Sequence, residues 1–100
     1  MESTIETLKN IKIYADVAKK ATNDAIEAMR AYRSCCSHKA TYMEISENYI
    51  KQAKAFLRCA RFNASKLDVE HRREEANDIV INIECHIGCS EGAFREIFAE

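Results

Sequence analysis

The sequence predicts an all-α protein, an antiparallel up-down-up bundle of three long helices. The chain has no proline, and its only two glycines, Gly88 and Gly92, lie close together. A β protein of 100 residues needs several tight turns, which favour Gly, Pro, Asn or Asp, and no cluster of these residues occurs. Apolar residues also recur every three or four positions over most of the chain, as on one face of a helix. We therefore expect long helices joined by short connections.

Length and composition favour one folded domain covering residues 1–100. Apolar residues make up 47% of the chain and charged residues 31%, and the net charge is −1. No apolar run approaches the roughly 18 residues of a membrane span, and the acidic first residues do not resemble a secretory signal. We therefore expect a cytoplasmic protein with no membrane contact, in which the five cysteines are reduced thiols.

The first helix is expected to begin after Ser3 and to end near residues 34–38. Ser3 and Glu6 have the spacing of a capping box. The apolar stripe that follows is rich in alanine, and small side chains allow a neighbouring helix to approach closely. Ile5, Val17 and Ile26 are expected to widen the stripe. Its members are Leu8, Ile11, Ala15, Ala18, Thr22, Ala25, Met29, Tyr32 and Cys36.

The second helix is expected to begin at another capping box, from Thr41 to Glu44, and to end near residues 63–67. Its apolar face consists of Ile45, Tyr49, Ala53, Phe56, Ala60 and Ala64, with Ile50 and Leu57 beside them.

Asp68 is the expected N-cap of the third helix. We favour an end of this helix at Gly88, in the left-handed conformation, with Ser90 capping a short fourth helix over residues 91–99. The alternative is one continuous helix in which Gly88 and Gly92 form a notch for close packing. The expected apolar face consists of Val69, Ala76, Ile79, Val80, Ile83, Ile87, Phe94, Ile97 and Phe98.

Charge is distributed unevenly between the helices. Residues 41–67 carry a net charge of +3, and residues 68–100 carry −6. Lys51, Lys54, Arg58 and Arg61 fall on one stripe of the second helix, beside Phe62. Such a stripe suits the tracking of phosphates, with Phe62 stacking on a base. The alternative, which we favour, is a solvated face that is partly complementary to the acidic third helix.

Cysteine and histidine residues suggest a metal site at one end of the bundle. In an up-down-up bundle, Cys36 and His38 lie at the same end as Cys85 and Cys89, which share a helix face. Zinc takes four such ligands, although the usual paired Cys-x2-Cys signature is absent. We therefore assign no metal or cofactor, and Cys36, Cys59 and Cys85 serve in the alternative as small apolar core residues. A reactive Cys35 needs a lowered pKa, which a helix C-terminus opposes.

Arg33 and His38 have the Arg-x4-His spacing of helical HEPN ribonucleases, and the segment resembles that motif over these six residues. The resemblance implies that Arg33 holds a phosphate and His38 moves a proton. Ser34 stands where the motif commonly has Asn. We do not assign the chain to that family.

The function that the sequence favours is a small, non-enzymatic protein-interaction module of the adaptor, chaperone or inhibitor type. It would bury an apolar seam of its helices against a protein partner or a second copy of itself. Tyr42, Tyr49, Phe94 and Phe98 are the candidate contact residues. A zinc-binding helical protein and an RNA-binding protein or ribonuclease remain as alternatives.

Overall fold

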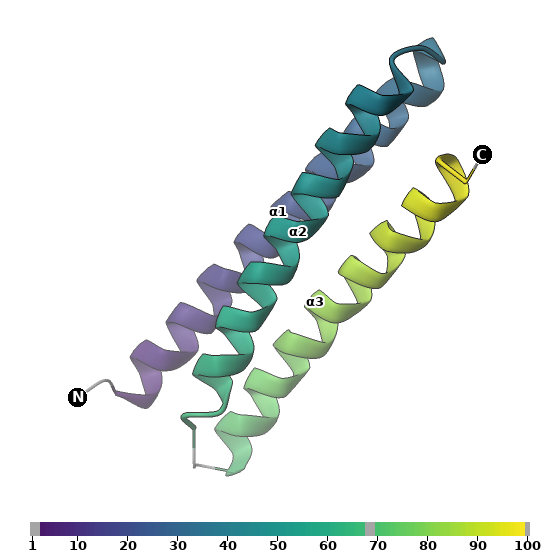
Figure 1. The fold of residues 1–100 in the computed structure, drawn as a ribbon. Helices are drawn as coiled ribbons and strands as arrows, with labels where there is room; N and C mark the ends of the chain where they lie inside the picture. Colours follow the sequence, from purple (N-terminus) through teal and green to yellow (C-terminus); the bar gives the residue numbers. More distant parts are fainter. Residues whose placement is uncertain (1–2, 68–69, 100) are drawn as a thin grey trace.

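The computed structural model describes residues 3–67 and 70–99 and confirms the predicted all-α fold. Three helices follow one another along the chain: α1 (Thr4–Cys35), α2 (Lys39–Ala64) and α3 (Glu70–Ile97). They form an up-down-up arrangement, with α1 and α3 parallel and α2 antiparallel to both (Figure 1). All three pairs of helices are in contact, and the molecule measures 50 × 20 × 15 Å.

The ends of α1 and the start of α2 are fixed by local hydrogen bonds and by a tight corner. Ser3 caps α1 as predicted, and its hydroxyl accepts a hydrogen bond of 3.1 Å from the backbone N–H of Glu6. Cys36 and His38 both adopt the left-handed conformation, with φ of 54° and 59°, and so reverse the chain within three residues. The predicted capping box at Thr41 is wrong, because this sharp corner starts α2 two residues earlier, at Lys39.

The core is narrow where α1 and α2 meet, and much of it is alanine. Alanines of α1 and α2 are buried together in one cluster. The same cluster contains larger aliphatic side chains of α3. Among the described residues, every buried polar side chain has a hydrogen-bond partner. The buried alanines of this cluster are Ala15, Ala18, Ala21, Ala53, Ala60, Ala64 and Ala76.

The predicted break at Gly88 is wrong, because α3 continues through it to Ile97. Neither glycine has a positive φ, and the buried stripe passes through Ile83, Ile87 and Ser90 without interruption. A break at Gly88 would remove the following turns from this stripe, which costs more than a glycine inside a helix. The notch is not used either, since a Cβ at Gly88 or Gly92 would meet nothing within 4 Å. The predicted N-cap, Asp68, and Val69 lie outside the described residues.

The apolar stripe of α1 is narrower than predicted. Ile5 and Val17 were expected to widen it, but their side chains are 72% and 38% exposed. Of the helices described, none has an apolar stretch long enough to cross a lipid bilayer.

Replacing either glycine of α3 by alanine should stabilise the protein. Alanine loses less backbone entropy than glycine in a helix, and at these two sites its methyl group meets open space. We expect Gly88→Ala and Gly92→Ala each to raise the free energy of unfolding by roughly 0.5–1 kcal/mol, measured by urea denaturation. A loss of stability in Gly88→Ala would show that the helix does not continue through residue 88.

Candidate functional site

The four candidate metal ligands, to which we assigned no metal from the sequence, are not brought together. Cys36 and His38 lie at the corner between α1 and α2, whereas Cys85 and Cys89 are exposed on α3. Within residues 3–67 and 70–99, no group of three or more metal-ligating side chains is close enough to hold an ion. The alternative role of Cys36 and Cys85 as core residues is also wrong, because both are exposed; Cys59 is half-buried.

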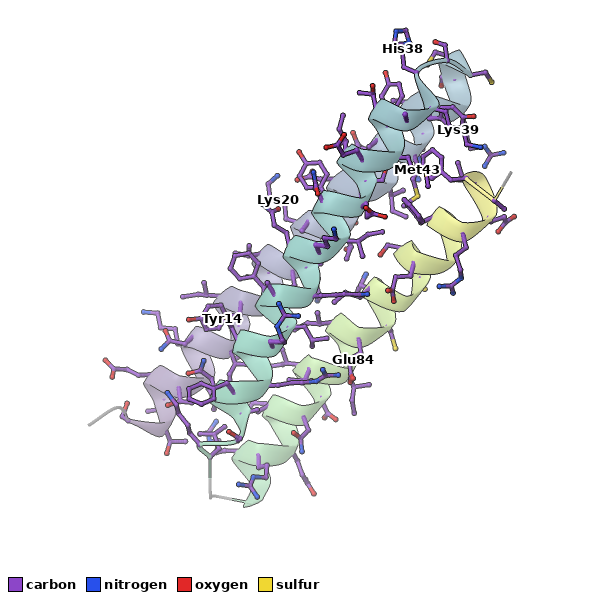
Figure 2. All side chains as sticks on the ribbon, viewed as in Figure 1. Tyr14, Lys20, His38, Lys39, Met43 and Glu84 are labelled. Atoms are coloured by element: carbon purple, nitrogen blue, oxygen red, sulfur yellow. The ribbon has the colours of Figure 1, made fainter. Side chains whose placement is uncertain are left out.

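Arg33 and His38 do not share a hollow of the surface. Arg33 is exposed in the last turn of α1 and lines a hollow with Tyr32, Cys36 and the end of α3. His38 is not among the lining residues; its Nδ1 lies 3.1 Å from the hydroxyl of Ser37. Figure 2 shows His38 at the tip of the bundle, pointing away from the helices. The pair is therefore not arranged around a common binding place.

Cys35 differs from the expectation for a thiol at a helix C-terminus. Hydrogen bonding with the backbone and the side chain of Ser37 lowers the pKa of the Cys35 thiol below its ordinary value of 9.0, and Tyr42 adds to the effect. The predicted opposite shift is wrong because the corner folds Ser37 back onto this thiol. Cys35 is thus more readily ionised than an ordinary thiol.

The predicted contact residues contribute to the protein's own core at the corner end of the bundle. Phe98 is only 6% exposed, and its ring centroid lies 5.1 Å from those of Phe94 and Tyr32. Tyr42 lies beside Tyr32 at 6.4 Å. Tyr42, Tyr49 and Phe94 are half-buried and pack against a second core cluster built on Ala25, Met29, Ile50 and Phe98.

The basic stripe of α2 is largely occupied by acidic partners. Lys54 pairs with Glu91 of α3 at 2.5 Å, and Arg61 pairs with Glu84 of α3. Lys51 pairs with Glu47 within α2. Arg58 makes no ion pair with any residue of the described chain. The stripe is therefore mainly complementary to α3, and Arg58 is its available cation.

A groove between α1 and α2 is the site that the sequence did not predict. It has a volume of about 620 Å³, and residues of α1, of α2 and of the turn after α2 line it. Tyr14 and Phe56 stack across the two helices with centroids 6.3 Å apart. Figure 2 shows Tyr14 on the side of the molecule that faces away from α3. The lining residues are Asn10, Tyr14, Ala55, Arg58, Cys59, Phe62, Asn63 and Lys66.

Phe62 places a large, mostly exposed aromatic side chain in this groove. Its side chain is 65% exposed, and the ammonium of Lys66 lies 4.8 Å from the ring centroid. Val17 follows Tyr14 by three residues on α1, so helical spacing places its side chain, which is 38% exposed, next to Tyr14 on the same face. We call the groove together with Val17 the open hairpin face. In the sequence, Phe62 is the aromatic residue beside the basic stripe of α2. Its place in one groove with Tyr14 follows from the register between α1 and α2.

Comparison of the chain with protein-family models, with curated proteins and with solved structures gives no significant match.

Replacing phenylalanine by alanine should lower the free energy of unfolding strongly in the core and only slightly at the surface. Phe98→Ala removes a buried ring and leaves a cavity, so we expect it to lower the free energy of unfolding by about 3 kcal/mol. Phe62→Ala removes a ring that is 65% exposed, and we expect a change of at most about 0.5 kcal/mol. Urea denaturation of both variants measures the difference. Equal losses would contradict the assignment of Phe98 to the core and of Phe62 to the surface.

Proposed function

We propose that the protein is a non-enzymatic helical interaction module that binds a protein partner through the open hairpin face. The observation that carries this proposal is the groove between α1 and α2, with a largely exposed phenylalanine at its edge. Aromatic rings in half-open grooves are typical anchors of protein interfaces. The sequence placed the contact surface on Tyr42, Tyr49, Phe94 and Phe98; because Phe98 is buried, we move it to Tyr14, Val17 and Phe62.

The arrangement of the three helices supports this choice of surface. α3 packs against one side of the α1–α2 hairpin, and the groove lies between the two helices with no residue of α3 in its lining. A hairpin of two helices accepts a further helix along its open side, as in a four-helix bundle. The partner is a different protein or a second copy of this chain.

Site-specific photo-cross-linking tests the proposal in cells that make the protein. A benzophenone amino acid replaces Val17 in the open hairpin face, and in a control it replaces Ile81 of α3. Both residues are exposed β-branched side chains in the middle of a helix, 38% and 54% exposed. We expect irradiation to give a defined covalent adduct with a protein from position 17 and no such adduct from position 81.

The adducts are identified by mass spectrometry. Equal adducts from the two positions would contradict a specific docking face. A nucleic acid adduct at position 17, or no adduct there, would contradict a protein-interaction module that uses this face.

A further inference from the structure

We infer that the partner segment is an acidic amphipathic helix, which lays its apolar side against Tyr14 and Phe62 and places a carboxylate beside Arg58. This inference rests on the proposed function and names the chemistry of the partner. Three observations support it: the charge of the groove, the way the hairpin already holds α3, and the shape of the groove.

The groove differs in charge from the other hollows of the surface. Its lining includes the cations Arg58 and Lys66 and no acidic residue among those that the structure describes. Four other hollows of the described surface each have at least one glutamate in their lining, and Arg58 also borders one of them, between α2 and α3. Arg58 is exposed and without an ion-pair partner in residues 3–67 and 70–99. The groove is thus a local positive site on a protein of net charge −1.

The molecule itself shows how the hairpin binds an acidic helix. The segment 68–100 has a net charge of −6, and α3 covers one side of the hairpin with an apolar stripe between ion pairs. Glu75 pairs with Lys12 of α1 at 3.5 Å, and Glu91 pairs with Lys54 of α2 at 2.5 Å. The open hairpin face repeats this combination of apolar surface and flanking cation. A helix of the same character as α3 therefore fits it.

The shape of the groove suits a short helix. On α1 the groove is lined by Asn10 and Tyr14, and with Val17 the open hairpin face extends along about 10 Å of this helix at the rise of 1.5 Å per residue. On the other side, Ala55, Cys59, Phe62 and Lys66 are spaced by three or four residues, so they form one stripe. A partner helix with apolar residues at i, i+3 or i+4, and i+7 would contact this length over about two turns.

Single-stranded nucleic acid fits the groove less well. Its affinity comes mainly from several phosphate contacts, whereas three of the four stripe cations are paired with glutamates. One face of the Phe62 ring is also covered by Lys66, and Tyr14 stacks with Phe56. Few charges and little free ring surface remain for a base and its backbone.

Two synthetic helical peptides of 18 residues test the inference by fluorescence anisotropy. They share the same leucine stripe and differ only in the flanking residues, which are glutamate in one and lysine in the other. We expect the glutamate peptide to bind at least about tenfold more tightly, because charge complementarity selects the partner. Raising the salt concentration should weaken the binding of the glutamate peptide, because salt screens the charges.

Variants of the full chain locate the binding site. We expect Arg58→Glu and Phe62→Ala each to lower the affinity for the glutamate peptide by at least about fivefold, as for anchors of an interface. Arg73→Glu changes an exposed arginine of α3 and should leave the affinity unchanged. Circular dichroism and thermal melting check that each variant folds, which the exposure of all three side chains makes the expected result.

Three results would overturn the inference: equal binding of both peptides, no effect of Arg58→Glu, or tighter binding of an oligouridylate 15-mer than of the glutamate peptide. If neither peptide binds but position 17 still gives a protein adduct, only the acidic character of the partner helix is rejected. Absence of that adduct rejects the proposed function itself.

Discussion

Alanine side chains line the contact between α1 and α2, and their small size lets the two helices lie close together along their length. This contact is the most extensive of the three pairs. Toward the corner end, the second core cluster also contains the larger Met29 and Ile50, and beside the alanines large apolar residues lie at the two edges of the contact. Leu57 and the isoleucines of α3 fill one edge. Tyr14 and Phe56 stack at the other, which stays open to solvent.

The two edges of this hairpin differ in what covers them. On one side α3 supplies both the apolar stripe and the glutamates that pair with Lys12, Lys54 and Arg61. On the other side, aromatic and basic residues line the groove, and no helix of the described residues covers it. The proposed docking of an acidic helix thus extends to the open edge the chemistry that already holds α3.

Much of the fold could be predicted because a continuous helical stripe requires only local spacing. The buried positions of α1 from Leu8 to Met29 follow the predicted pattern of three and four. The width of that stripe was overestimated at Ile5 and Val17, since spacing alone does not tell where a neighbouring helix ends. Gly88 was misjudged because its local cost of about 1 kcal/mol is smaller than the packing of the stripe that continues through Ile87 and Ser90.

The groove could not be predicted in the same way. Tyr14 and Phe62 are distant in the sequence, and the corner at residues 36–38 sets the register that brings them together. That corner depends on two left-handed residues, Cys36 and His38, neither of which is a glycine. The complementarity of the basic stripe and α3 was accessible, since opposite net charges on neighbouring helices are visible in the sequence. Which cation remains unpaired is decided by the side-chain positions alone.

Native-state hydrogen exchange tests most directly whether the alanine seam holds the molecule together. If it does, amides of the seam, such as those of Ala18 and Ala60, exchange only when the whole protein unfolds. Amides of α3 around Gly88 exchange through openings of lower free energy, because this helix has less extensive contacts with the other two. Protection of α3 equal to or greater than that of α1 and α2 would contradict this account.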